Sequence, residues 1–185
     1  MSEGSTRPRT VDRNIDLTFL SFLLLAYVCY SMFRMALGVM LPDMAEEFGL
    51  VEVQSGAFFS SLFFGMTMTM AIAGYISDRL GRGITSTAGL SLISVGLLLT
   101  GSSSSYAMSL ASLFTAGLGV GIFVSSLYAV MGEILPRSRG FLGGVANGVY
   151  AFGAFLGPWL SGNIARYYGW RIPFHIFGLA GVPVA

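Results

Sequence analysis

The stretch GYISDRLGRG, Gly74–Gly83, decides how the rest of this sequence is interpreted. It follows the run AFFSSLFFGMTMTMAIA (57–73), which contains no charged residue, and it places Asp78, Arg79 and Arg82 within five positions. A solvent-exposed loop has no need of glycine at both of its ends. The stretch therefore predicts a short, tight turn at the end of a long apolar helix.

The composition indicates that this turn belongs to an integral membrane protein. The 185 residues are 54% hydrophobic and only 10% charged, whereas soluble domains carry roughly 25% charged residues. The single cysteine, Cys29, and the single histidine, His175, cannot form an internal disulfide or a metal site. No Ser-His-Asp arrangement, phosphate-binding glycine loop or pair of catalytic carboxylates stands out. We therefore expect no enzyme activity, no cofactor, no metal and no nucleic-acid partner.

Six apolar segments are candidates for membrane-spanning helices, because a bilayer core of about 30 Å needs roughly 20 apolar residues in a helix. The sixth segment is still apolar at Ala185, so we expect the sequence to stop inside that helix. The predicted fold class is all-α integral membrane, with a tail at 1–16 and a six-helix bundle at 17–185. The expected helices lie at about 17–41, 55–76, 84–101, 106–131, 141–165 and 171–185.

The arginines predict the orientation of this bundle in the membrane, since basic residues favour cytoplasmic loops. With the N-terminus inside, the inner segments carry seven arginines, at positions 7, 9, 13, 79, 82, 137 and 139. The outer segments carry two, Arg166 and Arg171, and the first outer loop, PDMAEEFGLVE, is acidic. We expect a multi-pass protein of the plasma membrane with a cytoplasmic N-terminus, in contact with the lipid bilayer.

The fifth expected helix is rich in residues that allow close packing. Gly153 and Gly157 have the small-xxx-small spacing that lets two helix backbones approach in lipid, and a proline follows that should bend the helix. Ordinary tight packing explains any one of these residues equally well. The predicted packing motif consists of Gly144, Gly153, Gly157, Pro158 and Gly162.

The turn between the second and third expected helices carries the pattern G-x-x-x-D-R-x-G-R. Its fixed positions are Gly74, Asp78, Arg79, Gly81 and Arg82. This pattern, in this position, resembles the signature loop of the major facilitator superfamily. The resemblance covers about residues 15–185 and implies one six-helix half of a transporter that usually has twelve helices.

Two further segments are similar to the same family. EILPRSRG, Glu133–Gly140, resembles its element between helices four and five. The glycines of the fifth helix resemble its motif best known from antiporters, with Ser161 where a glycine is usual. Leu113 stands where many members carry an arginine linked to proton coupling, so that role is not carried over to this chain.

The resemblance implies that the turn acts as a conformational latch. Gly74 would let a neighbouring helix approach, and Asp78 would face the positive N-terminus of a helix in the second half. Arg79 and Arg82 would pair with an acidic residue of the next inner segment. Alternatively, these two arginines serve only as cytoplasmic anchors. The full predicted set is Gly74, Asp78, Arg79, Gly81, Arg82, Glu133 and Arg139.

Arg34 is the charge expected inside the first helix. A central arginine costs about 2.5–3.5 kcal/mol on insertion scales, so it is interpreted as functional by default. It lies about 12 Å of helix rise before Pro42, so snorkelling or a structural pair is one reading and a cavity-facing substrate contact is the other. The segment FRMALGVMLPDMAEEFGL (33–50) resembles the helix-one region of the anion:cation symporter branch. That resemblance implies an organic anion, which a guanidinium fork suits.

Four weaker candidates accompany Arg34 in the predicted substrate site: Tyr27, Tyr30, Asn147 and Tyr150. The first two share one helical face with Arg34, at spacings i, i+3 and i+7. Polar side chains inside a bundle can equally hold helices together.

Together these observations predict a secondary active transporter of a small solute, with an organic anion favoured, that works by alternating access. The coupling ion, H+ or Na+, is left open. The expected partners are the substrate and a second six-helix half, in the same chain or in another subunit. The alternative is a non-transporting six-helix scaffold, or a half-transporter that needs a partner chain.

Overall fold

The computed structural model describes residues 13–134 and 139–181, with side chains from 18 to 133 and from 140 to 181. Five of the helices in these residues are long and apolar enough to cross a membrane, and the sixth has 11 residues. The predicted all-helical membrane fold is confirmed. The helices are α1 (Arg13–Phe48), α2 (Glu52–Leu80), α3 (Arg82–Gly101), α4 (Tyr106–Ile134), α5 (Arg139–Tyr168) and α6 (Arg171–Gly181).

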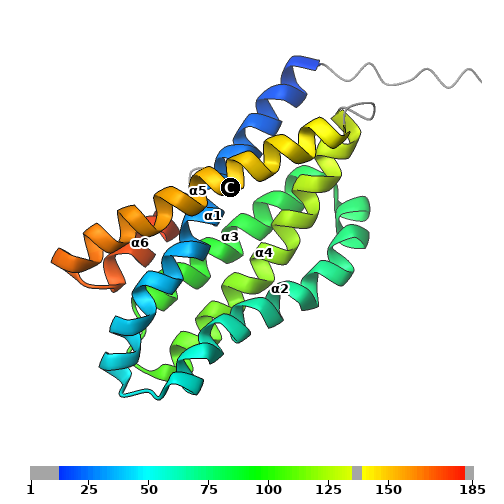
Figure 1. Ribbon diagram of the computed structural model, residues 1–185. Helices are drawn as coiled ribbons and strands as arrows, with labels where there is room; N and C mark the ends of the chain where they lie inside the picture. Colours follow the sequence, from blue (N-terminus) through cyan, green and yellow to red (C-terminus); the bar gives the residue numbers. More distant parts are fainter. Residues whose placement is uncertain (1–12, 135–138, 182–185) are drawn as a thin grey trace, which may run out of the picture.

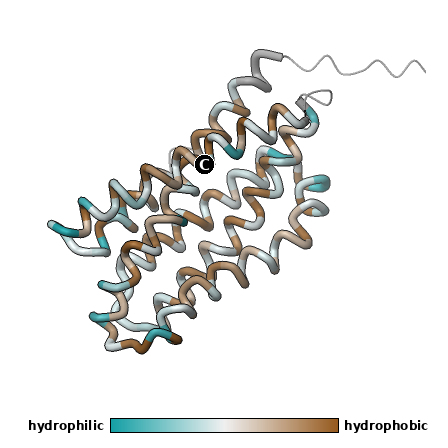
Figure 2. The backbone as a smooth tube through the Cα atoms, in the orientation of Figure 1, coloured by the Kyte–Doolittle hydropathy of each residue, from teal (hydrophilic) through white to brown (hydrophobic). Residues whose placement is uncertain are grey.

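Successive helices run up and down the bundle (Figure 1). The α2–α3 and α4–α5 connections lie at one end, here called the Arg82 end, and the α1–α2, α3–α4 and α5–α6 connections lie at the other, the Glu47 end. The strongest hydrophilic colouring lies near these helix ends, while the lengths between them are largely apolar (Figure 2). This distribution suits a bundle whose sides face lipid.

The first helix is longer than the sequence predicts. α1 continues through Pro42 to Phe48, across most of the segment expected to form an acidic loop. Two features explain the difference: the side chain of Met44 is fully buried in the core, and the first glycine with positive φ, Gly49 at +62°, comes directly after Phe48. Leu50 N donates to Ala45 O, which is the hydrogen bond of a Schellman motif.

A single residue, Gly81, joins α2 to α3. Its φ of +89° lies in a region that favours glycine. Its own N–H donates to the Ser77 carbonyl at the end of α2, and its carbonyl accepts from Thr85 N at the start of α3. One glycine therefore reverses the chain direction with its backbone groups hydrogen-bonded on both sides.

Helix α4 packs between α2 and α3 through its own glycines. A Cβ on Gly117 would overlap the Leu62 carbonyl of α2, and a Cβ on Gly119 would overlap the backbone of Gly89 on α3. Side-chain hydrogen bonds join the same helices: Thr69 donates to Leu118 O at 2.9 Å. Close approach with hydrogen bonds across the interface is the usual way that helices associate in lipid.

Helix α5 packs against α1 through part of the predicted glycine motif. A Cβ on Gly153 or Gly157 would overlap α1 at Val28–Met32, and one on Gly162 would lie 3.3 Å from Val39 Cγ1. The motif continues through Pro158, which lies inside α5. Gly144 does not share this contact, since a Cβ there would meet nothing within 4 Å among the described residues.

We predict that Gly157→Ala lowers the free energy of unfolding by about 1–3 kcal/mol, because the added methyl group overlaps the Met32 backbone. Gly148→Ala on the same helix is the matched control, since a Cβ at that position meets nothing within 4 Å. Denaturant unfolding of the purified protein in detergent measures both. Equal stability of the two variants would contradict the α1–α5 contact.

Candidate functional site

Arg34 lies half-buried in α1, and groups of two other helices surround its guanidinium. Nη1 donates to the Tyr150 hydroxyl of α5 at 2.7 Å. Cζ lies 5.0 Å from the centre of the Phe63 ring of α2 and 5.6 Å from that of Tyr150. The ion pairs found in the described residues all involve other arginines. The Tyr30 hydroxyl also interacts with Arg34. The guanidinium is therefore held by two hydroxyls and two aromatic rings, without a described carboxylate.

Three tyrosines predicted from the sequence gather beside Arg34. The rings of Tyr27 and Tyr30 stack with their centres 5.7 Å apart, and Tyr150 lies 5.8 Å from Tyr27 and 6.4 Å from Tyr30. Tyr27 and Tyr30 are buried within this cluster. The Tyr27 hydroxyl also lies 3.5 Å from that of Tyr128 on α4. The site thus draws on four helices, α1, α2, α4 and α5.

Asn147 is the predicted candidate that the structure places elsewhere. Its side chain is exposed, and its Nδ2 donates to the Gly143 carbonyl one turn earlier in α5, at 3.0 Å. The Asn147 side-chain amide is therefore hydrogen-bonded within its own helix. No contact in the described part of the chain joins Asn147 to Arg34 or to the tyrosines.

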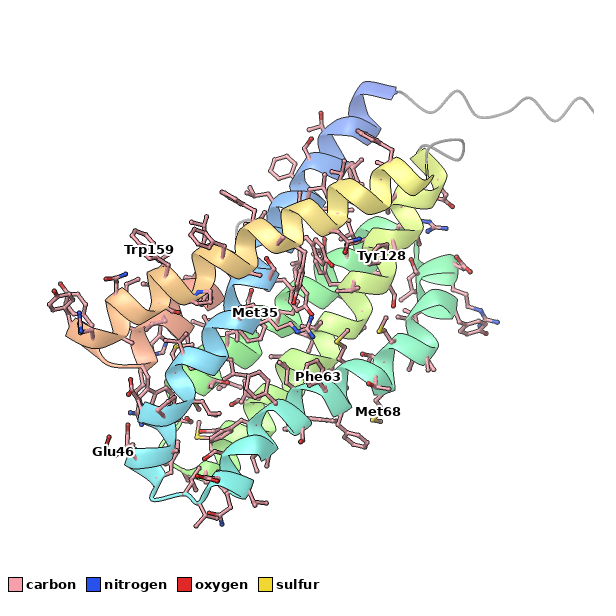
Figure 3. All side chains as sticks on the ribbon, viewed as in Figure 1. Met35, Glu46, Phe63, Met68, Tyr128 and Trp159 are labelled. Carbon is pink, nitrogen blue, oxygen red and sulfur yellow. The ribbon has the colours of Figure 1, made fainter. Side chains whose placement is uncertain are left out.

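Phe63 and Tyr128 belong to the site but were not predicted from the sequence. Figure 3 shows both in the middle region of the bundle, whereas Glu46 lies at one end and Trp159 on the outer side of α5. Tyr128 is a polar aromatic residue within an apolar helix, which was an available signal. Phe63 offered none, because it lies in an apolar run that contains other phenylalanines.

A cavity of about 450 Å³ continues from Tyr128 toward the Arg82 end. Residues of α3, α4 and α5 form its walls. Tyr128 lines this cavity and also contacts Tyr27, so the cavity lies next to the tyrosine cluster. The lining includes Arg82, Tyr128, Gly132, Glu133, Leu142 and Gly143.

Three of the predicted latch residues meet at the Arg82 end. Arg82 Nη2 lies 2.5 Å from Glu133 Oε1 and 3.7 Å from Asp78 Oδ1. The Ser126 hydroxyl donates to the Arg82 carbonyl at 3.1 Å, which adds a second link between α3 and α4. Arg82 therefore connects the ends of α2, α3 and α4.

The remaining latch residues are placed differently. The predicted pairing of Arg79 with Glu133 is absent from the described contacts, because the Arg79 guanidinium lies over the ring of Tyr75, 4.6 Å from its centre and one turn earlier on α2. A Cβ on Gly74 would meet nothing within 4 Å among the described residues. The side chain of Arg139 lies outside the described part of the chain.

Comparison with known proteins identifies the family. Residues 23–185 match the family model described as Major Facilitator Superfamily. The chain belongs to this family. The predicted resemblance is confirmed, and the six helices correspond to the N-terminal half of the transporter fold of the Major Facilitator Superfamily.

Individual relatives support the assignment. An uncharacterized MFS-type transporter of Mycobacterium tuberculosis is 34% identical over 78% of this chain and 20% of its own length. The benzoate transport protein of Acinetobacter baylyi is 29% identical over 80% of this chain and 32% of its length. The voltage-gated purine nucleotide uniporter of Homo sapiens is 25% identical over 78% and 35%. This chain therefore spans about a third or less of the length of these relatives.

A solved structure shows the same fold. The crystal structure of tetrameric PepTSo2 superimposes with a TM-score of 0.76 at 17% identity, over 94% of this chain and 40% of that one. A likeness at this identity extends to the fold alone. Membership of a transporter family, rather than an enzyme family, agrees with the expectation drawn from the sequence.

A second polar cluster, at the Glu47 end, was not predicted from the sequence. Glu47 Oε2 accepts hydrogen bonds from Arg171 Nη1 at 2.5 Å and from Trp170 Nε1 at 2.7 Å. Arg171 Nη2 also donates to the Ser103 carbonyl in the α3–α4 turn, at 2.8 Å. The cluster ties together α1, α6 and this turn. Its partners are 124 residues apart in the chain, and no local pattern pairs them.

We predict that Glu47→Ala lowers the free energy of unfolding by about 1 kcal/mol, chiefly because it leaves the buried Trp170 indole N–H without its acceptor. The partly exposed pair with Arg171 contributes less. Glu46→Ala removes the same charge from the neighbouring exposed position and should change stability by less than about 0.5 kcal/mol. Unfolding in detergent at low and high salt compares the two variants. The prediction is wrong if both lose the same stability.

Proposed function

We propose that this chain is the N-terminal half of a secondary active transporter that moves an organic anion by alternating access. The observation that carries the proposal is the environment of Arg34: a half-buried guanidinium far from both ends of a membrane-spanning helix, with no described carboxylate partner. Substrate would bind between this half and a second six-helix half. An ion gradient, of H+ or Na+, would supply the energy.

The contacts of Arg34 favour substrate binding over snorkelling. A snorkelling arginine extends along its helix until its charged group reaches the membrane interface. Arg34 instead donates to Tyr150, which lies well inside α5, and rests on Phe63 of α2. The hydrogen bond to Tyr150 uses one side of the guanidinium and leaves further N–H donors for a ligand. A carboxylate or phosphate suits this fork.

Two of the relatives are named for anionic solutes. Benzoate and purine nucleotides both carry negative charge, and the proteins named for them match about four fifths of this chain. Another relative is named as a multidrug resistance protein, so the family resemblance alone does not choose a substrate. The choice of an anion therefore depends on Arg34.

The proposed setting is the plasma membrane, with the N-terminus and the Arg82 end in the cytoplasm. This orientation follows from the arginine-rich loops at that end. There, Asp78, Arg82 and Glu133 would form the part of a latch that this half contributes. Forming and breaking the contact with the second half would bias the protein between its inward-open and outward-open states.

We predict that Arg34→Ala abolishes uptake of an anionic substrate while the protein still inserts into the membrane. The change removes the proposed anion contact without adding a charge. Arg166→Ala, which deletes an exposed arginine on α5, is the matched control and should retain uptake. Uptake of labelled benzoate by proteoliposomes with the complete protein measures both variants. Normal uptake by Arg34→Ala would refute the anion proposal.

We also predict that Asp78→Asn slows transport severalfold and leaves substrate affinity within about twofold. The change removes a charge at the end of α2, 3.7 Å from Arg82, whereas Arg34 lies well inside α1. Asp43→Asn, at the opposite end of the bundle, is the control. Transport rates in liposomes and equilibrium binding in detergent are compared. A loss of binding as large as the loss of transport would argue against the latch.

A further inference from the structure

The aromatic rings around Arg34 indicate which class of organic anion this site would bind. We infer that the substrate is a monocarboxylate with an aromatic ring, bound by its carboxylate to Arg34 and by its ring against Phe63. This inference rests on the proposed function and deepens it. Three features carry it: the rings beside the guanidinium, the exposure of one of them, Phe63, and the distribution of charge in this half of the bundle.

Two aromatic rings lie against the guanidinium of Arg34. Phe63 and Tyr150 both lie within 6 Å of Cζ, at distances typical of cation–π contacts. The Tyr150 hydroxyl occupies Nη1. A carboxylate that pairs with the remaining N–H groups of Arg34 therefore lies close to aromatic carbon.

Of the rings near Arg34, Phe63 is open, whereas two rings of the tyrosine cluster are buried. Phe63 is 38% exposed, while Tyr27 and Tyr30 are 6% and 4% exposed. Tyr128 is also open, but it reaches Arg34 only through Tyr27 and Tyr150. The buried rings support the site, and the open Phe63 ring is the surface available to the body of a ligand.

The charges of this half favour one carboxylate without an ammonium group. The acidic residues whose side chains the structure describes all lie near helix ends: Asp43, Glu46, Glu47, Glu52, Asp78 and Glu133. Within the described residues of this half, no carboxylate lies where it could neutralise the amino group of a zwitterion bound at Arg34. The other described arginines, Arg79, Arg82, Arg166 and Arg171, are also near helix ends. A second carboxylate beside Arg34 would likewise lack a partner in this half.

An aromatic ring bound beside Phe63 would also have a more favourable binding free energy than a saturated ring of similar size. Aromatic pairs prefer offset or edge-to-face arrangements with centres 4.5–7 Å apart, and such pairs are stabilised beyond the area that they bury. The rings already present in the site follow this spacing. Cyclohexanecarboxylate would keep the charge and the bulk of benzoate but lose the ring–ring interaction.

The test measures dissociation constants for three probes with the complete protein in detergent. Benzoate carries the carboxylate and the ring, cyclohexanecarboxylate the carboxylate alone, and phenylalanine adds an ammonium group. We expect benzoate to bind about fivefold more tightly than cyclohexanecarboxylate, and phenylalanine to bind at least tenfold more weakly than benzoate. Arg34→Ala should abolish binding of both acids.

A pair of neighbouring variants separates ring stacking from an effect on Arg34. Phe63→Leu should remove most of the preference for benzoate over cyclohexanecarboxylate. If Phe63 served only to position Arg34, the affinities for both acids would fall together and the preference would persist. Phe64→Leu is the control, because the Phe64 ring packs on Phe114 instead, and it should keep the wild-type preference.

The outcomes distinguish the two proposals. Equal affinity for benzoate and cyclohexanecarboxylate, or tight binding of phenylalanine, would overturn the aromatic monocarboxylate and leave an organic anion as the proposed substrate. A preference unaffected by Phe63→Leu would overturn the assigned ring contact. Failure of both acids to bind would overturn the aromatic monocarboxylate, whereas binding that survives Arg34→Ala would overturn the anion site at Arg34 and this inference with it.

Discussion

Close backbone approach at small residues is the constraint on which the rest of this bundle depends. Within lipid, apolar side chains gain little by leaving one apolar environment for another, so helices associate through packing and interhelical hydrogen bonds. Gly117 brings α4 against Leu62 of α2, and the next residue, Phe63, is thereby placed at Arg34. Gly153 and Gly157 bring α5 against α1, which sets the distance between Arg34 and Tyr150. The polar site therefore follows from where glycines let backbones meet.

The same glycine contacts arrange five of the helices in two groups. Helices α2, α3 and α4 are joined by glycine contacts and by hydroxyl groups such as the Ser86–Ser126 pair, whose oxygens are 2.7 Å apart. Helices α1 and α5 form the other close pair. Arg34 bridges the two groups, since it donates to Tyr150 within its own pair and rests on Phe63 of the other group. A ligand bound at Arg34 would touch both groups.

Polar clusters hold the helices together at both ends of the bundle, and the two clusters differ in how far apart their residues are in the chain. At the Arg82 end, a single glycine between α2 and α3 brings Asp78 and Arg82 within one turn of each other, so a local pattern already indicates their contact. At the Glu47 end, α1, α6 and the α3–α4 turn meet through partners that are distant in the chain. The first cluster could be anticipated from its motif, and the second could not, because no spacing rule relates Glu47 to Arg171.

The sequence by itself determined the membrane class, the six helices, the family and the unusual charge at Arg34. These features depend on composition, on the length of apolar runs and on short motifs, all of which are local. Only the tertiary structure decided that Arg82 rather than Arg79 reaches Glu133, that Asn147 bonds to its own helix, and that Phe63 and Tyr128 join the site. These outcomes depend on the rotation of each helix about its axis. That rotation is set by backbone contacts between glycines and residues far away in the chain. The spacing of apolar residues does not reveal it, because the helix face toward lipid and the helix face toward the core are both apolar.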